Sequence, residues 1–589
     1  MTIAWNTHYY LALWTILGLI GTPGPMAYPD DDPVIIEATR SKGYIQCSRW
    51  TLNQLRTSVM HPDELRYPDR HGLAGIVNES SKVWRVRAAA RNYMLPTLPL
   101  EVYSVMQMEC LEHDGCGDML FMLPYHEAMH TTDVRAFNAG TSKQLQCILL
   151  NTIDKADITC YRDIEYANQT IVQREPNCNG CHPAVYRLTL DSVVPRGGVV
   201  NIRVEHLLGK PYAPLQPGLS LDEQQRVVFV VTTLMVAPYH VELQRTRFSF
   251  SEDSRVQLST AHNYARLHEI EENVFVTGPF ENVELLSTGE TMAIEFDFHD
   301  SMEFIPQVHK RIRVPVWPGW YYYNVQEEYI VYNDSSKLKG HFSVDKLIRN
   351  EQDLSTNSRA NHVAYMEAIF PEEAMKLRYY DVNGNISRMY LSEDIVVPKY
   401  KTVDIIPRYP LLGGWKAVFT LDYCLPQSHN VDTYTAHMDT KGQSAIWRHL
   451  QAAARWILAY VKGNVITLQV PFYPAIYYMY VQELVVQIVL PPGARVEIVE
   501  VPKMATFTRE NITKRVVGVC IEVETVKVQA LRLAVHDMER YLKEYIKVKY
   551  TLGMLWVARV VASAVVHVAA GYVVVMAWNR YTRVNNNKL

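Results

Sequence analysis

Apolar and polar side chains alternate along one short stretch of the chain with the two-residue period of a β-strand. The odd-numbered positions from Trp415 to Tyr423 are apolar, and most positions between them are polar. This period predicts a half-buried strand that turns one face to a core. Ahead of it, Pro407 and Pro410 favour extended backbone, and the pair Gly413-Gly414 permits a tight turn. We therefore expect an extended lead-in, a Gly-Gly corner and a strand anchored by Trp415.

A strand, a turn rich in proline and glycine, and a second strand recur along the chain. The pattern is clear from Tyr186 to His206 and from Leu484 to Val501, and looser from Glu367 to Ser387, where Asn383-Gly384 adds a second turn. Recurrence at this spacing predicts a mainly β protein with two sandwich-like domains, over residues 28–310 and 311–550.

Two segments depart from the β pattern. Ser444 to Val461 is rich in alanine and leucine and contains no glycine or proline, so a helical insertion is expected there, near 444–461. Val528 to Ile546 mixes charged and apolar residues at roughly helical spacing. This second segment is expected to be a helix or a strand, and its pattern does not decide between them.

Both ends of the chain carry apolar runs. Leu11 to Ile20 has the length of a signal-peptide core, which predicts a signal peptide over 1–27, although a short buried helix fits as well. Val560 to Trp578 is long enough to cross a hydrocarbon core, so 552–578 is expected to form one C-terminal transmembrane helix rather than a buried core helix. Residues 579–589 then form a short, basic cytoplasmic tail. The expected topology is a single-pass type I membrane protein.

The remaining composition agrees with a secretory route. A net charge of −4 over 589 residues gives no nucleic-acid footprint. Nine cysteines fit an oxidising compartment, but the sequence leaves their pairing open. The candidate N-glycosylation sites are Asn78, Asn168, Asn333, Asn385 and Asn511.

Two short strings suggest chemistry. In HEAMH, His126 and His130 stand one helical turn apart and Glu127 lies between them, a spacing that can hold zinc beside a general base. No third ligand follows at the usual spacings, so a solvated loop or helix is the preferred interpretation. CNGCH, from Cys178 to His182, has the form of a haem-attachment or redox motif, but its turn-like surroundings favour a structural disulfide. No catalytic residue, metal ligand or cofactor is assigned with these strings alone.

The segment PRYPLLGGWK, followed by VFTLDYCLP, resembles the most distinctive segment of the ribophorin I family, a subunit of the oligosaccharyltransferase of the endoplasmic reticulum. RYYDVNGNIS and VQIVLPPGARVEI are similar to further elements of that family, and YRLTLDSVVPRGG matches it more faintly. The motif residues on this resemblance are Pro407, Arg408, Tyr409, Pro410, Gly413, Gly414, Trp415 and Lys416.

The resemblance implies a non-catalytic subunit with most of its chain in the lumen. The complex moves a preassembled oligosaccharide from dolichyl diphosphate to the asparagine of N-x-S/T in nascent chains. The implied partners are the catalytic and other subunits, nascent secretory polypeptides and the membrane, with no nucleic acid and no cofactor. Two alternatives remain: a membrane-anchored zinc metallopeptidase that uses HEAMH, and a cell-surface adhesion or receptor ectodomain.

Overall fold

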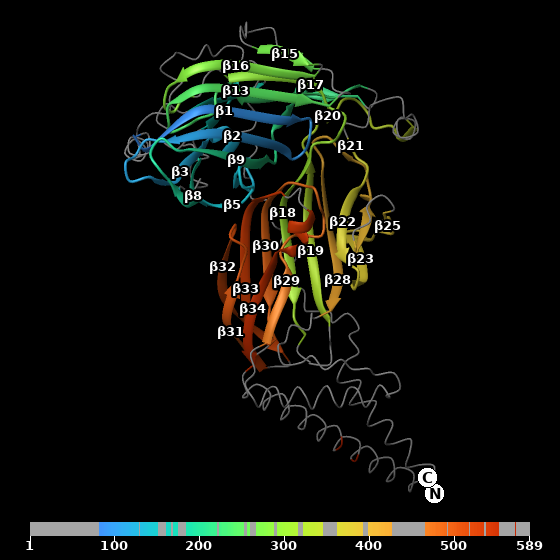
Figure 1. Cartoon of the computed structure of the whole chain (residues 1–589). Helices are drawn as coiled ribbons and strands as arrows, with labels where there is room; N and C mark the ends of the chain where they lie inside the picture. The colour runs from blue at the N-terminus through green and yellow to red at the C-terminus, as the bar shows by residue number, and fades with distance from the viewer. Residues whose placement is uncertain are drawn as a thin grey trace, which may run out of the picture.

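The computed structural model contains two β-sandwiches, one above the other in Figure 1. It describes residues 82–128, 130–150, 161–166, 169–174, 184–220, 223–251, 256–258, 267–271, 273–287, 291–315, 322–345, 362–392, 398–426, 466–491, 493–516, 519–534 and 538–552, with 572 and 576. The mainly β fold class predicted from the sequence is confirmed for this part of the chain. The predicted N-terminal signal peptide, the predicted helix at 444–461 and the CNGCH string lie outside the described residues.

The first domain is built on a ten-stranded sheet. In spatial order its strands are β15 (Leu267–Glu271), β16 (Val274–Val283), β13 (Val241–Phe250), β1 (Trp84–Leu95), β2 (Leu100–Cys110), β9 (Val199–Leu208), β4 (Arg135–Asn138), β5 (Gln144–Leu149), β8 (Ala184–Val194) and β3 (Cys116–Leu123). A smaller sheet packs against one part of it and consists of β10 (Tyr212–Pro214), β12 (Arg226–Thr232), β17 (Thr291–Asp297) and β14 (Val256–Leu258). Buried aromatic rings from both sheets, including Tyr93, Phe229 and Phe248, meet between them.

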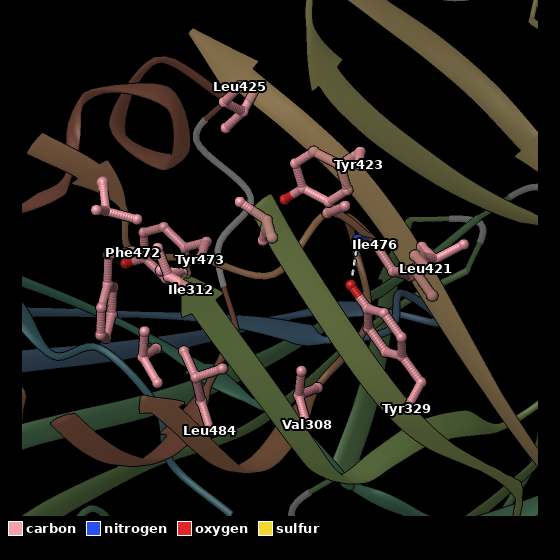
Figure 2. Packing of buried hydrophobic residues seen from close by; sticks show 14 of the residues in the cluster. Val308, Ile312, Tyr329, Leu421, Tyr423, Leu425, Phe472, Tyr473, Ile476 and Leu484 are labelled. Atoms are coloured by element: carbon pink, nitrogen blue, oxygen red, sulfur yellow. Dashed lines mark hydrogen bonds between the residues drawn. The ribbon is translucent and has the colours of Figure 1, made fainter. Parts of the chain in front are cut away.

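The second domain is built on an eight-stranded sheet. Its order is β24 (Gly384–Asn385), β23 (Met375–Asp381), β28 (Lys416–Pro426), β19 (Tyr322–Asn333), β18 (Glu303–Arg313), β30 (Val481–Val489), β33 (Val519–Leu533) and β32 (Ala505–Val516). Two three-stranded sheets face it: β22 (Met366–Pro371), β26 (Tyr400–Ile405) and β25 (Met389–Leu391); and β29 (Ile466–Pro471), β34 (Tyr545–Leu552) and β31 (Ala494–Glu500). Their inner faces form one continuous apolar core, part of which Figure 2 shows.

One charged pair lies inside this apolar core. The carboxylate of Glu327, on β19, accepts hydrogen bonds from the hydroxyls of Tyr329 and Tyr423 and from the backbone N–H of Ala475. The Nζ of Lys310 lies 3.0 Å from Glu327 Oε1. Because both charged side chains are at most 1% exposed, each depends on the other for its charge to be tolerated.

The predicted turns are confirmed, but their strands do not pair with each other. β8 leads into β9, yet β8 pairs with β3 and β5 while β9 pairs with β2 and β4. β30 likewise pairs with β18 and β33, whereas β31 pairs with β34. β22 and β23 also belong to different sheets. The turns after β30 and β22 therefore carry the chain from one sheet to another, whereas the turn after β8 joins two strands of the ten-stranded sheet that are not neighbours.

The strand predicted after the Gly-Gly corner is confirmed as β28. Its inward positions Phe419, Leu421 and Tyr423 are at most 3% exposed. The role given to Trp415 is wrong, because this side chain precedes the strand and is 46% exposed. Phe419 is the first fully buried residue of the strand and stacks on Tyr329, so it has the anchoring role instead.

Two predicted boundaries fall inside strands. β18 begins at Glu303, so the domain boundary expected near residue 310 lies within the second domain's sheet.

The segment from Val528 to Ile546 contains both strand and helix: it includes the end of β33, the helix α8 (Met538–Lys543) and the start of β34, whose last residue is Leu552. Among the described residues, no helix is long and apolar enough to cross a bilayer.

Candidate functional site: the corner and the domain joint

The motif residues form a compact corner between β26 and β28. After β26 the chain runs through residues 406–410, pairs as β27 (Leu411–Leu412) with β21 (His362–Val363), and turns at Gly413-Gly414. Gly414 has φ +79°, a conformation that residues with a Cβ rarely adopt. A Cβ on Gly413 would overlap the carbonyl oxygen of Ser336 and lie 2.8 Å from that of Ser335. Both glycines are therefore required by backbone geometry, as the sequence predicted.

Arg408 fixes the corner to the hairpin formed by β23 and β24. Its Nε donates to Asp381 Oδ2 at 2.7 Å and its Nη2 to Asp381 Oδ1 at 2.8 Å. Nη2 also donates to the carbonyl of Gly384 at 2.9 Å. These hydrogen bonds from Arg408 lower the pKa of Asp381, so the pair stays ionised at neutral pH. The two-pronged geometry gives the arginine a structural role that lysine cannot reproduce.

Asn333, at the end of β19, joins the corner to the loop that follows β19. Its side-chain Nδ2 donates to the carbonyl of Leu411 at 2.9 Å, and its Oδ1 accepts from the backbone N–H of Ser335 at 3.0 Å. Its backbone N–H donates to the carbonyl of Trp415, and its carbonyl accepts from Gly414. Asn333 is fully buried, so its amide cannot carry a glycan in this fold. This finding removes Asn333 from the candidate glycosylation sites.

The same loop continues directly into a contact with the first domain. The backbone N–H of Ser336 donates to Gln225 Oε1 at 2.9 Å. β20 (Lys337–Leu338) then pairs in parallel with β11 (Gly218–Leu219) of the first domain. Leu338 packs on the fully buried Leu412 of the corner. Through this contact the corner supports β20, the strand that joins the two domains.

Three further contacts complete what we call the joint, the set of interactions between the domains. Lys210 pairs with Asp334 at 2.8 Å, and its Nζ lies 3.8 Å from the ring centroid of Phe304. Gly209 lies against the ring of Tyr480 so closely that a Cβ would overlap it. At a third point, Nη1 of Arg532, on β33 of the second domain, donates to the carbonyl of Ala128 in the first domain at 2.7 Å.

The HEAMH string includes Ala128, the acceptor in this last contact, and has a structural role. Glu127 is 3% exposed, and its carboxylate accepts a hydrogen bond from the guanidinium of Arg91 and one from the Tyr93 hydroxyl. The helix α5 (Tyr125–Ala128) that carries it is only four residues long and ends before His130. His206 lies 3.9 Å from Glu127, and burial lowers the pKa of its imidazole, so it is neutral at pH 7. Since Glu127 is held by a buried arginine, it is not free to act as a general base on a metal-bound water.

The residues of the motif differ in whether they hold the corner or face the solvent. Arg408, Gly413 and Gly414 hold the corner, whereas Tyr409 is 66% exposed and Lys416 is exposed beside Trp415. Among the sequons, Asn385 and Asn511 are exposed, and Asn78 and Asn168 lie outside the described residues. The side chain of His126 is also outside the description.

Sequence reasoning missed four residues that hold the corner and the joint: Asp381, Gln225, Lys210 and Asp334. Each lies far along the chain from its partner or in a segment without a motif, so no local signal marks it. It also left the pairing of the cysteines open. A disulfide joins Cys110 to Cys116, and within the part of the chain that the structure describes Cys147 and Cys424 are free thiols.

Comparison with known proteins adds a family to this geometry. A sequence model of the Ribophorin I family matches residues 119–444, more than half of the chain. The matched residues include β26, the corner, and the β11–β20 and Lys210–Asp334 contacts of the joint. "Dolichyl-diphosphooligosaccharide–protein glycosyltransferase subunit 1B" of Arabidopsis thaliana is 25% identical over 339 residues, covering 57% of this chain and 66% of the relative. Subunit 1 of Schizosaccharomyces pombe is 25% identical over 321 residues, covering 51% and 67%. The matches thus extend over about two thirds of each relative's length.

Solved structures give only remote likenesses. Yeast LTA4 hydrolase overlaps with a TM-score of 0.21 at 8% identity, over 37% of this chain and 30% of that one. An M1 zinc metallopeptidase from Deinococcus radiodurans overlaps with a TM-score of 0.20 at 10% identity, over 45% and 50%. Similarity at this level carries no conclusion about fold or activity. Because the family model matches residues 119–444, more than half of the chain, the chain belongs to the Ribophorin I family.

Proposed function

We propose that this protein is a non-catalytic subunit of the oligosaccharyltransferase of the endoplasmic reticulum. That complex transfers a preassembled oligosaccharide from dolichyl diphosphate to asparagine in N-x-S/T of nascent polypeptides. One observation carries the proposal: the family match covers residues 119–444, which include parts of both β domains and the corner, and the matched relatives are named as subunits of that glycosyltransferase.

The geometry supports a scaffold role within such a complex. Domains of one chain are expected to move relative to each other unless their interface is extensive. Here a strand ladder, a buried ion pair and an arginine–carbonyl hydrogen bond connect the two sandwiches at separate points. A fixed pair of β domains is suited to holding partners at a defined separation.

The proposed setting follows the sequence. The chain is anchored as a single-pass type I protein of the endoplasmic reticulum membrane, with both β domains in the lumen. Its partners are the catalytic and other subunits, nascent secretory polypeptides and the membrane, and nucleic acid has no part. β34 ends at Leu552, the first residue of the predicted span, so the second domain lies next to the bilayer in this arrangement.

The zinc peptidase alternative is not favoured, because its general base would be Glu127, which is engaged by Arg91 and Tyr93. The adhesion or receptor alternative lacks a supporting observation of its own.

Purification of the tagged full chain in mild detergent tests the proposal. We expect a multi-span glycosyltransferase to co-purify, and depletion of the chain to leave secretory glycoproteins with empty sequons. A Gly413→Val variant, which disrupts the corner, should recover less of that partner than Gly117→Ala, where a Cβ meets open space. Failure to recover any glycosyltransferase under conditions that preserve the parent chain's fold would overturn the assignment.

A further inference from the structure

The hairpin formed by β32 and β33 extends past the end of the sheet to which it belongs. β30, the neighbour of β33, ends at Val489, which pairs with Thr525. Beyond that pair, β33 continues with β32 as its one partner among the described strands, from the pair of Asn511 and Glu524 to that of Val516 and Val519. These six pairs, over residues 511–516 and 519–524, form what we call the ribbon, which is about 20 Å long at the rise of an extended strand.

The ribbon begins at the end of the second domain where β34 also ends, far from the first domain (Figure 1). Val496, on β31, pairs with Tyr550, two residues before Leu552. The backbone N–H of Val496 donates to Glu524 Oε2 at 2.6 Å, so Val496 lies level with the first pair of the ribbon. From this level Leu552 is two residues further, whereas Val519 is five residues further. The turn of the hairpin therefore reaches roughly 10 Å beyond Leu552.

Strand register divides the ribbon into an apolar and a polar face. Directly opposed residues in a β-ladder share a face, and the faces alternate from one residue to the next. Because an isolated two-stranded hairpin is at best marginally stable in water, a ribbon of this composition needs a second surface against its apolar face. The apolar face holds Ile512, Val516, Val519, Ile521 and Val523 with Lys514, and the polar face holds Asn511, Thr513, Arg515, Cys520, Glu522 and Glu524.

The sequence of the turn is also apolar. Two residues, Val517 and Gly518, connect the last pair, Val516 and Val519. Two-residue turns in hairpins favour asparagine or aspartate before glycine, whereas this turn has valine in that place. The basic residues 514 and 515 come directly before these four. An apolar tip followed by basic residues is the pattern of elements that lie in a membrane interface, where lysine and arginine reach the headgroups.

The predicted span gives the depth of the bilayer relative to this turn. Residues 552–578 are about 40 Å long as an α-helix. The bilayer is about 40–45 Å thick with its headgroups and about 30 Å thick without them, so the headgroup layer on each side is about 5–8 Å. Leu552 then lies at the outer limit of the lumenal headgroup layer. A turn that reaches roughly 10 Å further lies at the boundary of the hydrocarbon core.

We propose that the turn of the β32–β33 hairpin inserts into the lumenal leaflet of the bilayer, with residues 516–519 at the hydrocarbon boundary and Lys514 and Arg515 at the depth of the phosphates. The inference rests on the proposed single-pass anchoring of the chain. The hairpin is then a second attachment of the second domain to the membrane, beside the span. A domain held at one point is free to tilt about that point, whereas two attachments fix its orientation. The second domain would thereby hold its partners at a defined height and angle above the bilayer.

Site-specific photo-cross-linking of the full chain in nanodiscs of phosphatidylcholine and phosphatidylinositol tests the proposal. A diazirine-bearing leucine analogue replaces Val516, and mass spectrometry measures the fraction of its peptide that carries phospholipid. The matched control is Val382, which is 93% exposed in the turn of the β23–β24 hairpin, at the corner end of the same domain. We expect at least about tenfold more lipid adduct at Val516, because burial of one valine side chain favours an apolar medium over water by about that factor.

A charge in the turn gives a second test. Val519→Glu places a carboxylate at the hydrocarbon boundary and should lower the lipid adduct of the analogue at Val516 severalfold. Thr508→Glu adds the same charge at an exposed position of β32 outside the ribbon, and should leave the adduct unchanged. An adduct that Val519→Glu does not lower would contradict insertion of the turn.

An adduct at Val516 no larger than at Val382 would refute the proposal, and so would cross-linking of Val516 mainly to protein, which would assign the hairpin to a partner subunit. The same analogue at Val573, within the predicted span, separates this outcome from the proposed anchoring. If Val573 is joined to lipid and Val516 is not, only the hairpin proposal fails. If neither is joined to lipid, the single-pass anchoring fails together with it. Co-purification of a glycosyltransferase tests the proposed function independently of both results.

Discussion

Replacing Asn333 with alanine tests the view that this asparagine is structural. In the parent chain, Nδ2 donates to the carbonyl of Leu411 and Oδ1 accepts from the N–H of Ser335, which is 3% exposed. The hydrogen bonds of the Asn333 backbone with Trp415 and Gly414 do not involve the side chain and can persist. Asn333→Ala therefore leaves one buried N–H without its acceptor and one carbonyl without this donor.

The expected cost follows from these two groups. A buried polar group left without its partner destabilises a fold by about 1–3 kcal/mol, so two such groups give about 2–6 kcal/mol. In a domain of this size, each 1 kcal/mol lowers Tm by roughly 2–4 °C. Even the lower limit of about 2 kcal/mol predicts a decrease of roughly 4–8 °C.

Differential scanning calorimetry of the detergent-purified chain measures this decrease, and the other sequons supply the controls. Asn511→Gln removes an exposed sequon asparagine of the same domain and should leave Tm within about 1 °C of the enzymatically deglycosylated parent. Mass spectrometry of the parent should find Asn333 unmodified. A Tm for Asn333→Ala equal to that of Asn511→Gln, or a glycan on Asn333, would refute the reasoning.

Three further predictions concern the core of the second domain, the corner and the thiol of Cys147. Lys310→Met removes the cation from the buried Glu327 and should lower the free energy of unfolding by about 3–5 kcal/mol, while adding Glu327→Gln should restore part of it, both measured by denaturant titration. Gly413→Ala should cost about 1–3 kcal/mol or more by overpacking, whereas Gly117→Ala should stay within about 0.5 kcal/mol of the parent in the same assay. Burial raises the pKa of the Cys147 thiol to about 12, so the fold favours the protonated, unreactive form. Iodoacetamide at about pH 8.5 should therefore alkylate Cys147 far more slowly in the folded chain than in the denatured chain, as followed by mass spectrometry.

The local features of the fold were predictable because their causes are local. The alternation from Ala417 onward forms β28, and Gly414 has the positive φ that a Gly-Gly turn requires. Trp415 was misplaced because it belongs to the turn rather than to the strand. Its backbone N–H donates to the carbonyl of Leu412, and this fixes the residue outside the alternation.

Strand pairing was not predictable from the turns, since a partner is chosen by contacts far along the chain. Pro195 and the glycines after it do make a turn, but the strand before it pairs with β3 and the strand after it with β2. A hairpin and a turn between strands that do not pair can therefore have the same turn residues, and only the buried faces of distant strands distinguish them.

The HEAMH string and the Asn333 sequon could not be recognised as structural from the sequence, because the partners of their side chains lie far along the chain. Glu127 has the spacing of a catalytic glutamate, but its partner Arg91 lies 36 residues earlier, on β1. Asn333 has the same N-x-S pattern as Asn385, yet its amide is used by Leu411, which lies 78 residues later. A motif states which atoms are present, whereas burial and partners decide whether those atoms are available to anything outside the fold.

The corner gives a reason why a scaffold subunit would depend on residues distant from any active centre. Its glycines allow the loop of Ser335 and Ser336 to approach, that loop holds β20 in place, and β20 connects to the first domain. β19 leads into this loop and spans 12 residues, about 40 Å at the rise of an extended strand. A disturbance at Gly413 would therefore alter the position of the first domain relative to partners near the opposite end of β19, without touching any partner directly. On this argument, corner variants should weaken assembly of the complex in proportion to their effect on the joint, and the exposed Tyr409 should be tolerant wherever no partner covers it.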